Sequence, residues 1–168
     1  MNKFAYLAAG FSQLGYVTRD LDAAVAFFTA QLGVAKFMRL TPAPILDETY
    51  LGQPAAQMRT NIAFGQAGKV NIELIQPLSG ESTYSHYLRE HPGQVTGLHH
   101  VGVQVYDWDK AGQDLRTLGY EAVQTGRFGA GTRFMYVDTR ATLGHYTEFF
   151  YYDEAAERLF DQIRRADF

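Results

Sequence analysis

The chain has 168 residues, which suffices for one well-buried domain or for two small halves that share a core, and is too short for a multidomain enzyme. Its formal net charge is −3, with acidic and basic residues interspersed, so we expect no basic face for nucleic acid or for a membrane surface. The chain has no cysteine, which excludes disulfides, thiolate chemistry and thiolate metal sites.

The first residues contain one lysine and an apolar run that is too short to span a membrane. A cleavable signal would place the cut too close to the strand that follows. We therefore expect residues 1–10 to form a short lead-in and the protein to be cytoplasmic, with no membrane or nucleic-acid partner.

Residues 11–17, F-S-Q-L-G-Y-V, alternate as a strand does and place Gln13 on its polar face. A helix follows, with Asp20 as its N-cap and Gly33 as its C-terminal stop. The helix carries an apolar stripe at helical spacing, made of Ala24, Phe27, Phe28 and Leu32.

After a strand over residues 35–40, the stretch 41–60 contains three prolines and is predicted to be a loop without regular structure. A loop of this length is often a lid or a binding loop. It carries Glu48, which we interpret as a solvated carboxylate; the alternative is a second acid or base that swings over a cavity.

Residues 70–76, V-N-I-E-L-I-Q, predict the last strand of the first half and place Glu73 in an otherwise apolar strand. The stretch 78–96 is rich in Ser, Gly, Thr and Pro, and we interpret it as a linker. Its middle, residues 83–90, is long enough for about two helical turns.

The pattern then restarts with G-L-H-H-V-G-V-Q-V over residues 97–105, where His100 lies on the polar face and His99 is expected on the helix side. Asp107 follows His100 by the same seven residues that separate Asp20 from Gln13. Glu148 lies in the last strand of this half, as Glu73 does in the first.

These correspondences indicate an internal duplication of a β-α-β-β-β unit, at about residues 10–77 and 97–152. The tail, residues 153–168, has the pattern of an amphipathic helix. It is expected to cover one end of the sheet, or to contribute to a dimer contact.

Four residues of ligand type occupy corresponding strands: Gln13, Glu73, His100 and Glu148. If each unit curls into half a barrel, all four point into one cavity. One imidazole nitrogen, one amide oxygen and two carboxylates suit a divalent cation and neutralise its charge. The alternative is a metal-free binding cup, in which Glu73 pairs with an arginine and His100 binds a backbone carbonyl.

The chain resembles the vicinal oxygen chelate superfamily, the glyoxalase, bleomycin-resistance and extradiol dioxygenase fold. The resemblance rests on S-Q-L-G-Y-V-T-R-D-L-D-A-A-V-A-F-F, N-I-E-L-I-Q-P, G-L-H-H-V-G-V-Q-V and G-H-Y-T-E-F-F. It implies one α+β domain over residues 1–168, in which two tandem βαβββ modules form a cupped eight-stranded mixed sheet with helices outside and a C-terminal helix. It also implies one metal, held where Gln13, Glu73, His100 and Glu148 stand.

The Gln/Glu/His/Glu set looks like that of glutamine-containing glyoxalase I enzymes, whereas E-L-I-Q-P-L-S-G-E-S followed by G-L-H-H looks more like the methylmalonyl-CoA epimerase branch. Two departures count against a glutathione-linked substrate: D-T-R-A-T-L-G replaces a common turn at residues 138–144, and Val17 stands where glutathione-using members have arginine. Gln13 counts against an iron extradiol dioxygenase, which uses a second histidine.

Our hypothesis is a glyoxalase- or epimerase-like isomerase or lyase that binds a small-molecule substrate and one divalent metal ion, Zn, Ni, Co, Mn or Mg. The metal acts as a Lewis acid, and a carboxylate, Glu148 first and Glu73 second, moves the proton. The alternatives are a metal-free ligand-sequestering protein of the bleomycin-resistance type and a ring-cleaving dioxygenase. We expect a homodimer. Candidates for an anion clamp are Arg39, Arg59, Arg127, Arg133 and Arg140.

Overall fold

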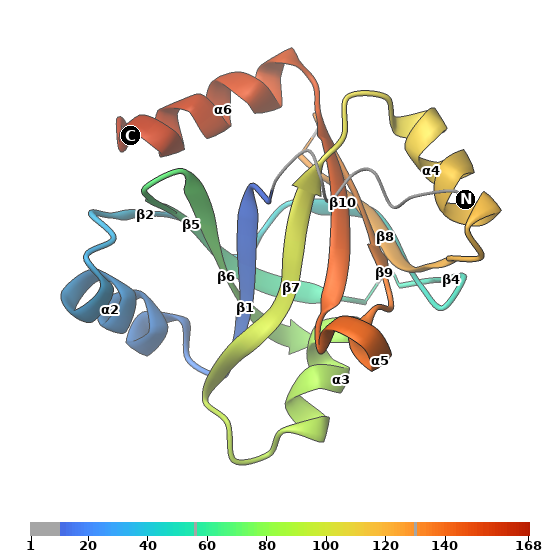
Figure 1. Cartoon of the computed structure of the whole chain (residues 1–168). Helices are drawn as coiled ribbons and strands as arrows, with labels where there is room; N and C mark the ends of the chain where they lie inside the picture. Colours follow the sequence, from blue (N-terminus) through green and yellow to red (C-terminus); the bar gives the residue numbers. More distant parts are fainter. Residues whose placement is uncertain (1–10, 56, 130) are drawn as a thin grey trace.

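A computed structural model describes residues 11–55, 57–129 and 131–168. The described residues form one mixed sheet of ten strands, in the order β2-β5-β6-β1-β7-β10-β9-β8-β3-β4, which curls around a concave face (Figure 1). The predicted α+β class and curled mixed sheet are confirmed, but the expected count of eight strands is wrong. The lead-in predicted for residues 1–10 lies outside the described residues.

The strands are β1 (Gln13–Thr18), β2 (Phe37–Leu40), β3 (Ile45–Tyr50), β4 (Gln53–Pro54), β5 (Arg59–Ala67), β6 (Val70–Ser79), β7 (Thr96–Gln104), β8 (Ala122–Phe128), β9 (Thr132–Val137) and β10 (Tyr146–Tyr152). The helices are α2 (Leu21–Leu32), α3 (Thr83–Glu90), α4 (Trp108–Thr117), α5 (Arg140–Leu143) and α6 (Glu154–Arg165). Within the described ranges, every helix is too short or too polar to cross a membrane.

The four central strands of the sheet are β6, β1, β7 and β10. β1 pairs antiparallel with β7, so that Gly15 lies opposite His100. β6 runs parallel to β1, and β10 runs parallel to β7. The two strands that open the predicted halves therefore lie side by side at the middle of the sheet, each flanked by the strand predicted to close its own half.

The two additional strands, β3 and β4, arise from the stretch predicted to be an irregular loop. β3 pairs with β8, with Ile45 opposite Phe128 and Tyr50 opposite Gln124. The prolines do not prevent this pairing, because two precede β3 and Pro54 lies in the short edge strand β4. A segment of the first half thus extends the sheet edge of the second half, which only the tertiary structure reveals.

The two outer helices begin as predicted. The side chain of Asp20 caps α2 by accepting a hydrogen bond from the backbone N–H three residues later, and Gly33 ends this helix in the left-handed region with φ 72°. Asp107 caps α4 in the same way. The predicted apolar stripe of α2 is only partly confirmed, because Phe27 and Leu32 are 55% and 56% exposed.

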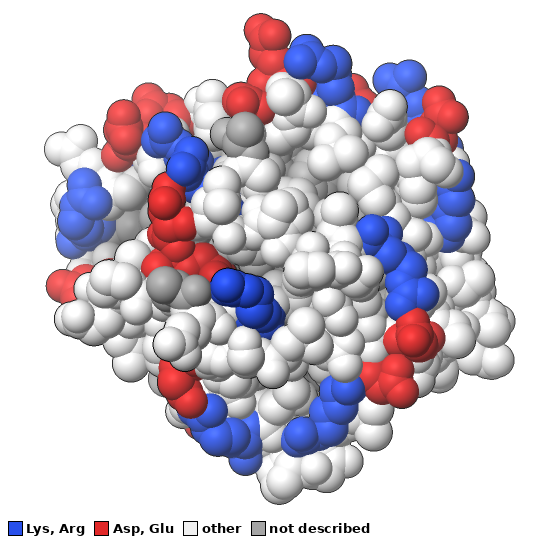
Figure 2. Space-filling view, turned by 180° about the vertical axis from the view of Figure 1, so that it is seen from behind, with Lys and Arg blue, Asp and Glu red and all other residues white. Residues whose placement is uncertain are grey.

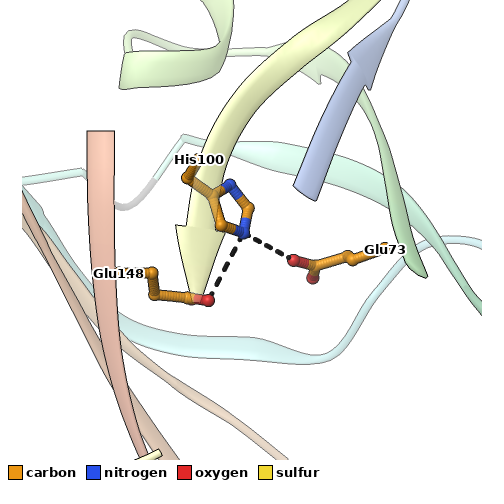
Figure 3. Close-up of side chains that lie close together, drawn as sticks. All are labelled: Glu73, His100 and Glu148. Atoms are coloured by element: carbon orange, nitrogen blue, oxygen red, sulfur yellow. Dashed lines mark ion pairs between the residues drawn. The ribbon is translucent and has the colours of Figure 1, made fainter. Parts of the chain in front are cut away.

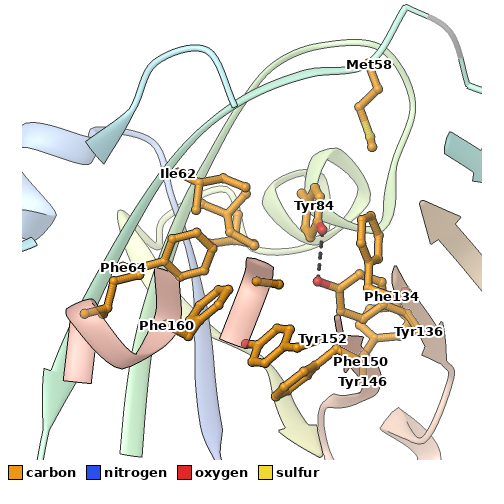
Figure 4. Packing of buried hydrophobic residues seen from close by; sticks show 14 residues of the cluster. Met58, Ile62, Phe64, Tyr84, Phe134, Tyr136, Tyr146, Phe150, Tyr152 and Phe160 are labelled. Atoms are coloured by element: carbon orange, nitrogen blue, oxygen red, sulfur yellow. Dashed lines mark hydrogen bonds between the residues drawn. The ribbon is translucent and has the colours of Figure 1, made fainter. Parts of the chain in front are cut away.

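The largest hydrophobic cluster fills the concave face of the sheet, and α6 contributes to it (Figure 4). Phe160 of α6 stacks on Tyr152 with ring centroids 4.3 Å apart and meets Phe64 edge-on at 5.1 Å. Ile163, one helical turn further along, is also buried. The tail helix therefore closes one end of the curled sheet, as predicted.

The short helix α3 lies at the opposite end of the sheet (Figure 1). Ser82 caps it with a reciprocal capping box, and Tyr84 is buried. The backbone N–H and the hydroxyl of Thr83 both donate to Gln124 Oε1, at 2.8 and 2.9 Å. These bonds fix the first turn of α3 against β8 and keep Tyr84 within the core.

We predict that Phe160→Ala lowers the free energy of unfolding by about 3–5 kcal/mol, because it removes a fully packed aromatic ring. Urea denaturation followed by circular dichroism measures this change. Phe27→Ala is the matched control: it removes the same side chain from a position that is 55% exposed, and a much smaller loss is expected. Equal losses for the two variants would contradict the packing role of α6.

Candidate metal centre

The four residues predicted as ligands come together on the concave face, one from each central strand: Gln13 from β1, Glu73 from β6, His100 from β7 and Glu148 from β10. All four are almost fully buried. His100 Nε2 lies 3.2 Å from Glu73 Oε2 and 3.4 Å from Glu148 Oε2 (Figure 3). Gln13 and the two carboxylates line one cavity of about 30 Å³.

Two glycines of the central strands make room for this cluster. A Cβ atom on Gly15 would lie 1.8 Å from Cε1 of His100, and one on Gly102 would lie 2.7 Å from Oε1 of Gln13. Neither position has a left-handed backbone, so the requirement is for space rather than for conformational freedom. Each glycine follows one of the predicted ligands by two residues in the sequence.

A cation would satisfy the polar atoms of the cluster better than their contacts with one another do. Three buried atoms of this cluster make no hydrogen bond of good geometry within the described part of the chain: Gln13 Oε1, Glu73 Oε2 and His100 Nε2, the last two being joined only by their ion pair of 3.2 Å. The ligand atoms of Glu73, His100 and Glu148 all lie within 4.8 Å of one another. Buried polar atoms that converge without partners are costly, and a divalent ion would satisfy them together.

The protonation of these residues also indicates that the cluster suits a bound cation. Burial disfavours the charged imidazolium of His100, but the carboxylates of Glu148 and Glu73 outweigh this effect and raise the pKa of His100 to about 9. Burial also raises the pKa of Glu73, an effect that Glu148 reinforces and His100 opposes. At neutral pH the metal-free cluster therefore retains a proton on His100 that a bound cation would displace.

His99 was expected on the helix side; its ring packs against Tyr84 and Tyr87 of α3, and against Tyr136 and Tyr146 in the sheet, rather than against α2 or α4. The pairing of β1 with β7 shifts between Gly15 and Tyr16, and this bulge leaves His99 without an opposite residue. Its Nδ1 lies 3.0 Å from Nδ1 of His100, and burial keeps its pKa well below the usual range. A neutral His99 can accept a hydrogen bond from Nδ1 of His100, which leaves Nε2 of His100 free for a metal.

Glu48 is not the solvated loop carboxylate that we inferred. It belongs to β3, directly after Asp47, which has a positive φ of 51°. Its side chain lies beside Phe134 above Gly126, and its Oε1 is buried without a hydrogen-bond partner. Burial raises the pKa of Glu48 to about 7, although the charge of Arg59 opposes the shift.

A pair of tyrosines at the cavity escaped the sequence analysis. Tyr84 of α3 donates a hydrogen bond of 2.9 Å to the hydroxyl of Tyr136 on β9, and both side chains line the cavity. The ring of Tyr136 lies edge-on to that of His100, with centroids 5.0 Å apart. The chain has eleven tyrosines, and no spacing or pattern distinguishes these two.

The structure does not bring the predicted arginine candidates together into an anion clamp. Arg39, Arg127 and Arg140 form ion pairs with exposed acids. Among the described residues that line the cavity, none is an arginine or a lysine. Figure 2 shows acidic and basic side chains interspersed over one face of the molecule, in keeping with the predicted lack of a basic face.

Comparisons with known proteins agree with this architecture. A family model described as "Glyoxalase/Bleomycin resistance protein/Dioxygenase superfamily" matches residues 12–136. The uncharacterized protein YqjC of Bacillus subtilis (strain 168) is 33% identical over 106 residues, which cover 60% of this chain and 71% of that protein.

Solved structures share the fold at lower sequence identity. A hypothetical protein from Bacillus halodurans C-125 is 20% identical with a TM-score of 0.63, covering 86% of this chain and 95% of that one. Methylmalonyl-CoA epimerase from Mycobacterium tuberculosis is 18% identical with a TM-score of 0.61, covering 89% and 91%. At these identities the likeness concerns the fold alone.

We predict that the metal-free protein loses stability as the pH rises from about 6.5 to about 9. The folded state holds a proton on His100 up to a pKa of about 9, whereas the unfolded chain releases it at about 6.5. The proton on His100 therefore contributes its full stabilisation, at most about 3 kcal/mol, below a pH of about 6.5. This contribution is lost above a pH of about 9. Urea denaturation of chelator-treated protein across this range measures the effect, and His100→Gln should show a smaller slope. An unchanged slope in that variant would contradict the assignment.

Proposed function

The chain belongs to the glyoxalase/bleomycin resistance protein/dioxygenase superfamily, and from this premise we propose that it is a metal-dependent isomerase, epimerase or lyase that moves a proton on a small substrate. The observation that carries the proposal is the convergence of buried ligand atoms from Glu73, His100 and Glu148, with Gln13 lining the same cavity as the two carboxylates. Gln13 Oε1 is buried there without a hydrogen-bond partner, which a purely structural cluster would supply.

The residues proposed to hold the metal are Gln13, Glu73, His100 and Glu148. One nitrogen and three oxygens suit Zn²⁺, Ni²⁺, Co²⁺, Mn²⁺ or Mg²⁺. When bound, such an ion acts as a Lewis acid toward substrate oxygens and makes a neighbouring C–H bond more acidic. Two carboxylates balance its charge within the buried site.

We assign the proton transfer to Glu148 first and to Glu73 second, because both carboxylates line the cavity at the proposed metal site. Glu48 is a further candidate. Its pKa of about 7 suits a group that both accepts and donates protons near neutral pH. Ile45, on the same strand, lines the cavity, so β3 forms a wall of the site.

The second candidate function is a metal-free binding protein of the bleomycin-resistance type. The observation in its favour is the apolar lining of the cavity: Ile45, Ile62, Phe64, Phe128, Phe134, Phe150 and Phe160. A ring-cleaving dioxygenase is a weaker alternative, because Gln13 occupies the position where a second histidine would serve iron.

For the finer architecture, we propose one domain over residues 1–168, made of two βαβββ modules at about 10–77 and 97–152. The linker 78–96 joins them, and the helical tail 153–168 follows. The proposal is supported by the sheet order: β6 is the parallel neighbour of β1, and β10 is in the same way the parallel neighbour of β7.

We predict that chelator-treated protein takes up one divalent ion per chain, measured by elemental analysis after gel filtration. Glu73→Gln and His100→Gln should each weaken uptake strongly, because the first removes a carboxylate charge and the second removes the imidazole nitrogen. The matched control is His86→Gln, which breaks an exposed His–Glu pair, His86 Nδ1 to Glu90 Oε2 at 3.2 Å, and should leave uptake unchanged. No uptake by the wild-type protein at micromolar metal would favour the binding protein instead.

Proton transfer is predicted to exchange a substrate C–H for deuterium in D₂O, followed by NMR with CoA thioesters and glutathione adducts as the probes. Glu148→Gln should reduce exchange by about 100-fold or more while the fold is kept. Glu154→Gln, which alters an exposed carboxylate on α6, should have no effect. Full exchange by the Glu148 variant would refute that residue's role. Oxygen consumption with iron and aromatic diols would instead identify a dioxygenase.

A further inference from the structure

We propose that Asn71 is a positioning residue that holds the side chain of Gln13 so that its carbonyl oxygen, and not its NH₂ group, faces the metal site. The inference rests on the proposed function and adds a residue that is not itself a ligand. Asn71 lies on β6, directly opposite Gln13 in the parallel pairing of β1 with β6. It is 9% exposed.

The orientation of Asn71 is set by the backbone. Its Nδ2 donates a hydrogen bond of 3.0 Å to the carbonyl oxygen of Gly65 on β5. A carbonyl oxygen can only accept, so this contact requires the NH₂ group of Asn71 to face Gly65. The reversed amide would place two oxygen atoms against each other in a buried place.

The orientation of Gln13 follows from that of Asn71. With its NH₂ group committed to Gly65, Asn71 presents Oδ1 to Gln13, and this atom can only accept. Nε2 of Gln13 donates to it at 3.2 Å. A flipped Gln13 amide would again place two oxygen atoms against each other. The backbone carbonyl of Gly65 therefore determines the orientation of both side-chain amides.

The consequence lies at the cavity. Because Nε2 of Gln13 is engaged, its Oε1 is the atom that remains, and it is buried without a hydrogen-bond partner. Oε1 therefore joins Glu73 and Glu148 as an oxygen at the cavity. A flipped amide would offer hydrogen atoms instead, which would repel a cation.

The test is a double-mutant cycle on metal affinity, with Zn²⁺ titrated into chelator-treated protein by isothermal calorimetry. Asn71→Ala should weaken binding by about 10- to 100-fold, because Gln13 becomes free to turn. In the Gln13→Ala background, the same substitution should have no further effect, because no amide remains to be positioned. Asn71→Leu, which has the same branching and no polar atom, replaces the alanine variant if that variant is unstable.

The matched control is Asn61→Ala, which removes an amide from the neighbouring strand β5 that bonds Gln76 at 3.4 Å, and no change in affinity is expected. Equal affinity of the wild-type protein and the Asn71 variants would overturn the inference. So would an equal loss in both backgrounds, which would show a general structural role. A wild-type protein that binds no Zn²⁺ would overturn the proposed metal site and this inference together.

Discussion

The structure depends on the free-energy cost of placing several ionisable side chains close together in a buried site. Two carboxylates and an imidazole lie within 4.8 Å of one another on the concave face, and each is almost fully buried. Like charges this close are tolerated only if protons or a cation lie between them. The central strands hold the groups in place, since each contributes one of the proposed ligands, Gln13, Glu73, His100 or Glu148.

Aromatic side chains at the two ends of the curled sheet shield this cluster from water. Phe160 of α6 closes one end, and Tyr84 of α3 closes the other, where its hydroxyl bonds Tyr136. Low local polarity strengthens electrostatic interactions in such a place and makes unpartnered polar atoms costlier. The same apolar packing that stabilises the fold therefore favours the protonated form of Glu73, whose pKa is raised chiefly by burial.

Alternation along single strands was enough to predict that Gln13, Glu73, His100 and Glu148 share a face, because strand geometry repeats every two residues. The same rule did not predict the contacts of His99, which a bulge leaves without an opposite residue. Glu48 could not be placed from the sequence either, since its strand forms only by pairing with a segment about eighty residues away. Local sequence patterns thus predict the central strands and their polar face. Pairing between distant segments decides which further side chains lie against that face.

The pairing of β3 with β8 also covers a sheet edge that would otherwise be open to pairing with a strand of another molecule. Without β3, the seven residues of β8 would present a row of free backbone groups to any passing strand. With it, the sheet ends in β2 and β4, which have four and two residues, and β4 includes a proline. Short edge strands are poor templates for intermolecular pairing, and the crossing segment covers the longer strand β8.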